Sequence, residues 1–377
     1  MKFKKIFSVI SLIFALVFGM LTNFSSSAKE DKSVIFYVEE TTRYSLAENY
    51  LFNNIYGLLA SIEYNNLVKS EDYYLGKLIS VNGTDNVFFA PIFDSNNNCI
   101  VLVKVFCDNL SNSFSISFSD SKIDIFNNLE TGKYYLSLGN DCIYLIGNNI
   151  CELLDGENNT NVLNKSSICT LQKSRDYSEI NILSEFLFEN HNSNHQNRSI
   201  ISSSLSVPFV SNGGGGGIYG YCWCSSSAAL CKYFGYSSTT ADNVHILIHG
   251  LSHPLVNCTG GSPNDAYNAI HNITSKTATV CGKNIRNDAA NAMSSINIGV
   301  PIYSSWGYYD ANNVRTGHAM VICGYTFDNS NGAFTYKIMD PNESTYQYVY
   351  SSYSATSVNY LIGPHYYTWE SSIYDWQ

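Results

Sequence analysis

Charged side chains are scarce in this chain, which has 21 Lys and Arg and 31 Asp and Glu among its 377 residues and a net charge of −10. No segment gathers Lys and Arg into a basic patch, so we expect no nucleic-acid partner. The chain is nonetheless 45% hydrophobic and contains 29 Tyr and 20 Phe, which excludes a disordered protein. Its length is sufficient for two domains, each with a core of its own.

Long apolar runs are also scarce. The run at residues 6–21 follows three lysines and precedes the small residues Ser26, Ser27 and Ala28. This arrangement is typical of a signal peptide over residues 1–28. The apolar run is short for a membrane-spanning helix, which favours a signal peptide over an uncleaved anchor. No later segment is apolar enough to span a membrane, so we expect a secreted, extracellular or cell-surface-associated protein with no stable membrane anchor.

Metal and phosphate motifs are missing as well. Cys222, Cys224 and Cys231 lack the C-x2-C or H-x3-5-H pairs of zinc sites. The glycine run from Gly213 to Gly217 is not followed by the Gly-Lys-Ser/Thr of a phosphate-binding loop. We therefore expect no metal and no cofactor. The cysteines number 11, and an odd count in an exported protein leaves at least one thiol unpaired.

The periodicity of the chain divides it into two units. Residues 33–155 alternate as strands do, apart from a helical spacing over residues 43–63, and together they predict an α+β unit. Residues 156–205 lose periodicity and predict an exposed linker, the kind of segment at which proteases cut. From residue 207 helices come first and strands follow, which predicts a second α+β unit.

The expected domains are a signal peptide at 1–28, an N-terminal domain at 29–190, a linker at 191–206 and a C-terminal domain at 207–377. Helices are expected at 43–63, 225–233, 241–251, 263–273 and 287–296. Strands are expected at 33–38, 74–81, 86–93, 99–106, 113–118, 133–138, 142–146, 301–306, 318–325, 334–339, 346–350 and 360–362.

Cys222 stands at the junction between the glycine run and the first helix of the C-terminal unit. A thiol in the first turn of a helix lies among unpaired backbone N–H groups at the positive end of the helix dipole, and both favour the nucleophilic thiolate. The glycines allow positive φ and the close approach of a substrate. We predict that Cys222 is a catalytic nucleophile, the alternatives being a buried structural cysteine and a merely flexible loop.

His318 and Asp340 are the expected partners of Cys222. His318 opens an apolar strand, and Asp340 closes the next one. If these strands pair as neighbours, the start of one lies beside the end of the other. His318 would then act as general base and acid, and Asp340 would orient its imidazole. Taken alone, a His opening a strand is more often a surface residue, and an Asp before Pro is usually a turn residue.

These motifs resemble those of the papain-like cysteine peptidases, especially secreted bacterial members and bacteriocin-leader-peptidase-like proteins. The resemblance covers residues 205–377 and is carried by Cys222-Trp223, Gly317-His318 and Met339-Asp340-Pro341-Asn342. It implies a papain-like α+β fold, with a helix packed on an antiparallel sheet. It also implies hydrolysis of peptide bonds in a protein or peptide substrate through a thioester acyl-enzyme.

The N-terminal part resembles the pro-domains of secreted zymogens such as streptopain, through residues 74–77 and 90–93. This likeness implies that residues 29–190 form an α+β pro-domain that acts as an intramolecular inhibitor.

The chain departs from the family pattern at two points. The family has a Gln about six residues before the Cys that helps to form the oxyanion hole, whereas this chain has Gly216 there, and Asn212 is the candidate replacement. Cys224 is an alternative nucleophile, because some secreted relatives place Trp before the Cys. The small residues Ala228 and Ala229 lie at the family's spacing from Cys222 and favour it.

The substrate-binding residues are less defined. Gly216 and Gly217 are candidates for binding an extended substrate by strand addition. Trp306 either shields the Cys–His pair from water or belongs to the core, which is the default for Trp. Three functions stay open: a secreted cysteine endopeptidase made as a zymogen, an acyl transferase or cell-wall amidase on the same fold, and a catalytically inactive surface-binding protein.

Overall fold

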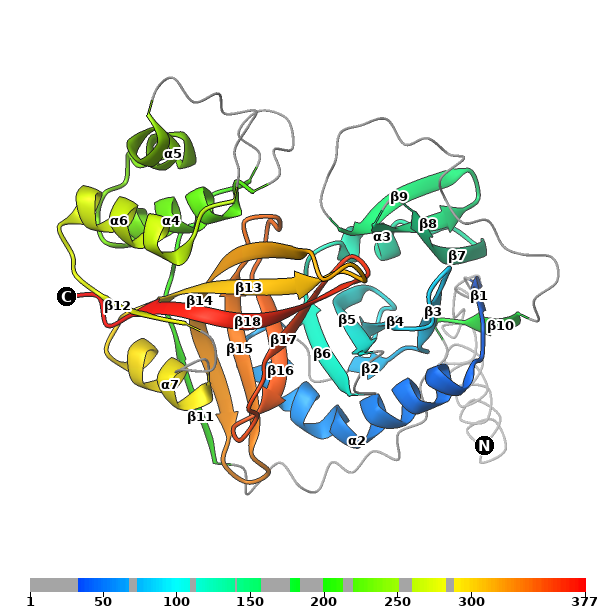
Figure 1. Ribbon diagram of the computed structural model, residues 1–377. Coiled ribbons are helices and arrows are strands. Elements are labelled where there is room, and N and C mark those ends of the chain that lie inside the picture. Colours follow the sequence, from blue (N-terminus) through cyan, green and yellow to red (C-terminus); the bar gives the residue numbers. More distant parts are fainter. Residues whose placement is uncertain are drawn as a thin grey trace, which may run out of the picture.

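The computed structural model describes residues 33–67, 73–108, 113–139, 141–156, 177–183, 199–212, 220–250, 260–282 and 288–377 (Figure 1). The fold is mixed α/β, with one large sheet and few helices. None of the helices within these ranges is long and apolar enough to span a membrane. The expected signal peptide lies outside the described residues.

The N-terminal part consists mainly of antiparallel strands with a long helix against them. Its helices are α2 (Thr42–Tyr64) and α3 (Ile123–Asn127). Its strands are β1 (Val34–Val38), β2 (Tyr73–Leu75), β3 (Ile79–Asn82), β4 (Val87–Asp94), β5 (Cys99–Cys107), β6 (Phe114–Ser119), β7 (Gly132–Gly139), β8 (Cys142–Gly147), β9 (Ile150–Asp155) and β10 (Ser178–Asn181).

Helix α2 begins at the N-cap Thr41, whose side chain accepts a hydrogen bond from the backbone N–H of Tyr44. Such a cap satisfies one of the N–H groups that a helix start leaves unpaired. The apolar residues that recur at three and four positions form the buried face of the helix, and this face packs against β5 and β6. They are Ala47, Leu51, Ile55, Leu58 and Ile62.

The C-terminal part combines four helices with the remaining strands. Its helices are α4 (Cys222–Tyr233), α5 (Ala241–His249), α6 (Pro263–Thr274) and α7 (Ala289–Asn297). Its strands are β11 (Ile200–Ser204), β12 (Thr279–Cys281), β13 (Ile302–Tyr309), β14 (Arg315–Asp328), β15 (Ala333–Met339), β16 (Gln347–Ser352), β17 (Asn359–Ile362) and β18 (His365–Tyr374).

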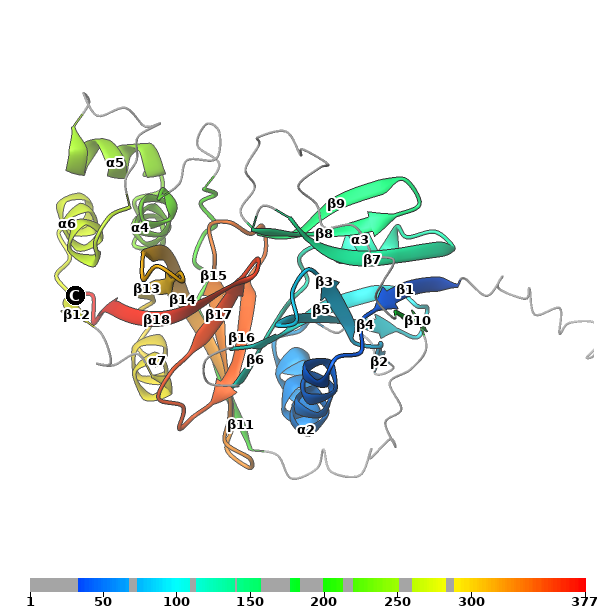
Figure 2. The same ribbon diagram turned by 45° about the vertical axis from the view of Figure 1, so that its right-hand side comes forward.

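Strand β14 is the centre of the C-terminal part, and its two faces serve two cores. Successive side chains of a strand point to opposite faces of a sheet. Ala319 and Val321 accordingly belong to a cluster with α4, α5 and α6, whereas Met320 and Ile322 belong to a cluster with α7. Figures 1 and 2 show α4–α6 on one side of the sheet and α7 on the other.

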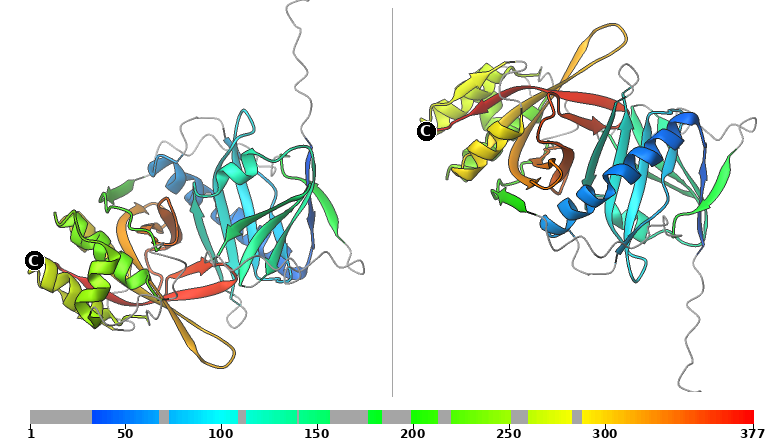
Figure 3. Two further views of the ribbon diagram at one scale, coloured as in Figure 1. Left: turned by 90° about the horizontal axis from the view of Figure 1, so that it is seen from above. Right: turned by 90° about the horizontal axis from the view of Figure 1, so that it is seen from below.

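The two parts share one continuous sheet. β6 pairs with β16 in antiparallel fashion, from Ser119 opposite Gln347 to Ile116 opposite Tyr350. The ring of Phe118 stacks on that of Tyr348, with 5.2 Å between the centroids. The hydrophobic core of the N-terminal part also includes side chains of the C-terminal part, Ala333, Tyr348, Tyr350 and Leu361. Figure 3 shows the two parts directly side by side from above and below.

Most expected elements are present, and the differences have local causes. The single strand expected at residues 74–81 is two strands, β2 and β3, separated by a segment in which Gly76 lies so close to the carbonyl of Ile182 and the ring of Phe93 that no side chain would fit there. Residues 200–204, expected to be irregular linker, form β11 and pair with β14. Strand β18 was not expected, although it is ten residues long.

Candidate active site

Cys222 is the first residue of α4, and 7% of its surface is exposed. The preceding residue Tyr221 is fully buried, and its hydroxyl donates a hydrogen bond to Asp242 of α5. Helix α5 therefore fixes the start of α4. The thiol of Cys222 is free. The candidate substrate-binding residues Gly216 and Gly217 lie outside the described residues.

Helix α4 is tied to β14 one turn after Cys222. The hydroxyl of Ser226 is completely buried and donates a hydrogen bond of 2.8 Å to the backbone carbonyl of Ala319, the residue after His318. The ring of Trp223 lies against Gly261, where a Cβ atom would not fit. These contacts hold the first turn of α4 at the beginning of the apolar part of β14.

His318 and Asp340 lie in direct contact. The Nε2 atom of His318 is 2.8 Å from Oδ1 of Asp340. Pairing of Val321 with Met339 brings the early part of β14 beside the end of β15, as the sequence predicts if these strands are neighbours. His318 is 2% exposed and Asp340 is 1% exposed, so solvent screens their interaction little.

The charges of this pair reinforce each other. Burial alone lowers the pKa of His318, but Asp340 and the Cys222 sulfur raise it, and the result lies well above its usual value. Burial raises the pKa of Asp340, but His318 lowers it, and the result lies below the usual value. The pair is therefore an imidazolium and a carboxylate near neutral pH. The second ring nitrogen of His318, Nδ1, is buried, and a hydrogen bond with the side chain of Cys222 contributes to the raised pKa of the imidazole.

Two further residues stand behind Asp340, and neither was expected as part of a site. The hydroxyl of Tyr360, on β17, forms a hydrogen bond to Asp340 that lowers the pKa of the carboxyl. The ammonium group of Lys104, on β5, lies 5.9 Å from the centre of the Tyr360 ring and 3.1 Å from Oδ1 of Asp155. The N-terminal part therefore contributes a buried ion pair, Lys104 with Asp155, next to the tyrosine that hydrogen-bonds to Asp340.

The sequence contains one indication that Lys104 takes part in a buried polar site, and it contains none for Tyr360. Lys104 interrupts an otherwise apolar strand, β5, and a buried lysine requires a partner. Tyr360 lies in a short strand whose local pattern does not distinguish it from an ordinary core tyrosine.

The other candidates lie close to the pair or in the core. Asn212 donates from its backbone N–H to the carbonyl of Pro341 and from Nδ2 to the side chain of Asn342, so it lies beside the turn that follows Asp340. Trp306 pairs with His318 across the β13–β14 ladder. Its ring is nevertheless fully buried and stacks on Trp369 at 5.9 Å, which makes it a core residue.

Cys224 lies two residues further along α4 and is fully buried, in contrast to Cys222. No group of three or more His, Cys, Asp or Glu side chains in the described ranges is arranged to hold a metal ion. The groups of the site that can take part in chemistry are the thiol of Cys222, the imidazole of His318 and the carboxylate of Asp340.

No protein-family model and no curated protein matches this chain. Among solved structures, one similar chain is described as "Crystal structure of UfSP from C.elegans", with 10% sequence identity and a TM-score of 0.29. The match covers 46% of this chain and 34% of that chain, so this chain spans about a third of the length of the structure it matches. A likeness this weak supports no conclusion about fold or function.

Proposed function

We propose that this chain is a papain-like cysteine peptidase in which Cys222 is the nucleophile, His318 the general base and acid, and Asp340 the residue that orients His318. In the resting ion pair the proton of the Cys222 thiol already lies on Nδ1 of the His318 imidazolium, and the thiolate sulfur attacks the carbonyl carbon of a peptide bond. The imidazolium then protonates the leaving amine, which leaves a thioester on Cys222. A water molecule, deprotonated by His318, hydrolyses the thioester and releases the acid.

The observation that carries this proposal is the buried contact of 2.8 Å between His318 and Asp340, with the Cys222 sulfur near enough to raise the pKa of the imidazole. Asp340 engages Nε2, so Nδ1 is the nitrogen left for the thiol. A positively charged imidazolium stabilises negative charge on a neighbouring sulfur. The first turn of a helix offers backbone N–H groups that its own hydrogen-bond ladder does not use, so the N–H of Cys222 at the start of α4 is a donor for the oxyanion of the tetrahedral intermediate.

The test is labelling with iodoacetamide, together with hydrolysis of a mixed peptide library read by mass spectrometry. We expect rapid alkylation of Cys222 and new peptide termini in the library. Cys222→Ala should abolish both, whereas the matched variant Cys224→Ala should retain hydrolysis. Loss of hydrolysis in Cys224→Ala alone would transfer the nucleophile to Cys224.

The same experiment separates the other two functions. Amine-capped products in place of free acids would identify an acyl transferase, and release of amino sugars or cross-bridge peptides from cell walls would identify an amidase. Absence of alkylation at Cys222 in the folded protein, at any pH from 5 to 9, would favour an inactive binding protein.

We further propose that residues 1–28 direct export and that residues 29–190 hold the enzyme latent until the linker is cut. Export is supported by the N-terminal sequence, in which lysines are followed by an apolar run and then by small residues. Latency is supported by the contact of Lys104, in the N-terminal part, with the ring of Tyr360 beside Asp340. Residues 29–377 are expected to gain activity when a protease cuts between β10 and β11. Equal activity before and after cutting would contradict latency.

A further inference from the structure

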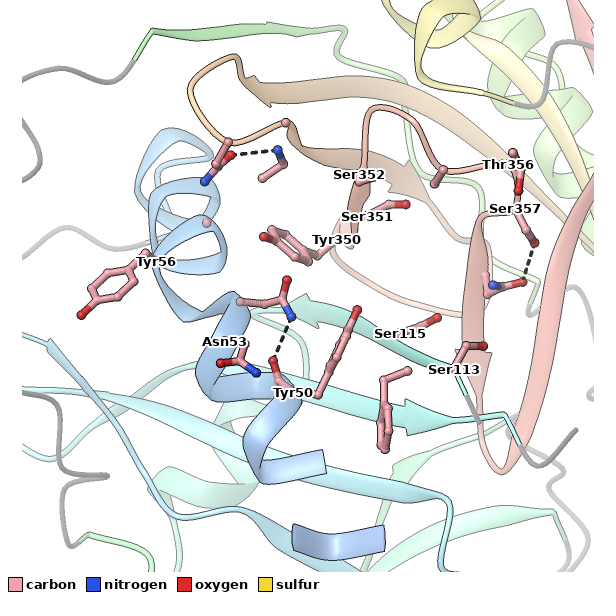
Figure 4. Close-up of a pocket in the computed structure, with 18 of the residues that line it drawn as sticks. Tyr50, Asn53, Tyr56, Ser113, Ser115, Tyr350, Ser351, Ser352, Thr356 and Ser357 are labelled. Atoms are coloured by element: carbon pink, nitrogen blue, oxygen red, sulfur yellow. Dashed lines mark hydrogen bonds between the residues drawn. The ribbon is translucent and has the colours of Figure 1, made fainter. Parts of the chain in front are cut away.

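A cavity of about 630 Å³ lies between the two parts of the chain, away from Cys222, His318 and Asp340. One wall is α2, another is the start of β6, and a third is the β15–β16 hairpin (Figure 4). Residues 355–357 and Asn359 close a further side. The cavity shares no residue with the proposed active site, so it requires an explanation of its own.

The lining of this cavity is neutral throughout. It consists of hydroxyl, amide, aromatic and small side chains, and no Asp, Glu, Lys, Arg or His lines it, although 14% of the chain is charged. The hydroxyl and amide residues are Asn53, Asn54, Ser113, Ser115, Asn331, Ser351, Ser352, Thr356, Ser357 and Asn359. A lining without charge offers no counter-ion to a phosphate, a carboxylate or an amine.

Aromatic rings form a rigid surface inside this neutral lining. The ring of Tyr50 stacks on Phe114, with 5.2 Å between the centroids and 24° between the planes. The hydroxyl of Tyr350 fits against Gly57 in the middle of α2, where a Cβ atom would collide with it. In Figure 4 Tyr50 points into the cavity, Tyr350 reaches across from its strand towards α2, and Tyr56 points away from the cavity.

Two amide groups are held in fixed orientations. Oδ1 of Asn331 accepts from the backbone N–H of Ala333, and Oδ1 of Asn359 accepts from the hydroxyls of Ser357 and Thr368. The Asn359 side chain also hydrogen-bonds to Tyr366, so the NH2 end of Asn331 is the amide group left to donate to a ligand.

We propose that this cavity binds a neutral oligosaccharide. A sugar ring presents an apolar C–H face, which suits a tyrosine ring, and hydroxyls around its edge, which suit amides and hydroxyl groups. A peptide fits less well, because β6, β15 and β16 are each paired on both sides and offer no free edge for strand addition. The site is independent of peptide hydrolysis and does not rest on the proposed function.

The test is saturation-transfer NMR and calorimetry on the full chain, with malto-, cello- and N-acetylchito-hexaose as probes. At least one of these is expected to bind, and oligogalacturonate, which carries carboxylates, is expected to bind more weakly. Tyr50→Ala should weaken binding about tenfold, as the loss of one aromatic contact implies. The matched control is Tyr56→Ala, whose side chain points out of the cavity and whose loss should leave the affinity unchanged.

Tyr50→Ala also removes packing on Phe114, so its thermal unfolding is measured alongside. Asn53→Ala, at an exposed position of α2, is the second variant and should weaken binding without changing the unfolding temperature. The proposal is overturned if no probe binds at millimolar concentration, if Tyr56→Ala weakens binding as much as Tyr50→Ala, or if only a neutral peptide binds with the same dependence on Tyr50. Each of these results is obtained without any measurement of hydrolysis, so failure here leaves the peptidase proposal standing.

Discussion

His318 is the residue whose charge state the rest of the proposed chemistry depends on. Its pKa lies well above the usual 6.5, since Asp340 and Cys222 outweigh the opposing effect of burial. A histidine with a raised folded-state pKa stabilises the fold fully below the unfolded value and loses that contribution as the pH rises through the folded value. The protein should therefore lose the stabilising contribution of His318 over a pH range that begins near 6.5 and extends upwards.

Asp340→Asn is expected to lower the pKa of His318, because it removes the nearby negative charge that raises the value most. NMR titration of the His318 ring would show this directly, and iodoacetamide labelling of Cys222 should slow in the same variant. Asp85→Asn serves as control, since Asp85 is an exposed partner of Arg43. An unchanged His318 titration in Asp340→Asn would contradict the coupling of the two side chains.

Lys104 should matter more to stability than an ordinary lysine. It is 4% exposed and paired with Asp155, which is 3% exposed. Lys104→Met leaves the Asp155 carboxylate buried without its partner and should cost about 3–5 kcal/mol of the free energy of unfolding, measured by urea denaturation.

The control for Lys104→Met is Lys133→Met, which breaks an exposed pair with Glu179 and should have a far smaller effect. The double variant Lys104→Met/Asp155→Leu should recover most of the loss, because it removes both buried charges. A double variant as unstable as the single one would show that packing, not charge, is the cause.

Among the secondary structure elements, the turn between β15 and β16 connects the site to the junction of the two parts. The backbone N–H of Glu343 donates to the carbonyl of Asp340 in this turn. Burial raises the pKa of Glu343 to about 7, with Asp340 and Asp155 raising it further and Lys104 and Lys122 opposing them. The folded protein therefore keeps a proton on Glu343 that the unfolded chain has lost.

Glu343→Gln tests this turn through the pH dependence of stability. Between about pH 4.5 and 7 the wild type should lose at most about 3 kcal/mol relative to the variant as the pH rises, because only its unfolded chain ionises in that range. Above pH 7 the variant should be the more stable protein. Parallel stability profiles of the two proteins from pH 4 to 8 would rule out a raised pKa for Glu343.

Local patterns in the sequence predict the elements well where caps and periodicity agree. Helix α6 begins at Pro263 after the N-cap Ser262, as expected, and Asp265 completes a capping box there. The same patterns cannot reveal which strands meet. The pairing of β6 with β16 and the contact of Lys104 with Tyr360 join segments more than 200 residues apart, so nothing local specifies them.

At the scale of the whole molecule, the β6–β16 ladder makes the junction resemble the interior of a domain. A further stack across the junction, beside the ladder, is that of Phe106 of β5 on Tyr366 of β18 at 4.6 Å. A buried hydrogen bond of 2.8 Å also joins Ser61 of α2 to Thr335 of β15. Any activation by proteolysis must therefore act on two parts that hold together without a covalent link.

Cutting the chain at an engineered protease site between residues 184 and 198 should leave both fragments in one complex. Size-exclusion chromatography of the cut protein would show a single peak of unchanged volume, because the ladder and the stacked rings persist. Tyr348→Ala removes the stack on Phe118 and should lower the urea concentration at which the fragments separate. Spontaneous separation of the wild-type fragments in buffer would contradict this prediction.

The same ladder has a consequence for biosynthesis. β6 is translated long before β16, and at 5–20 residues per second the interval is on the order of 10–50 s. During that time an edge of the N-terminal sheet has no partner strand, and unpaired edges attract other chains. The nascent protein should therefore need a chaperone, or a delay in folding, to avoid aggregating before its own C-terminal strand is made.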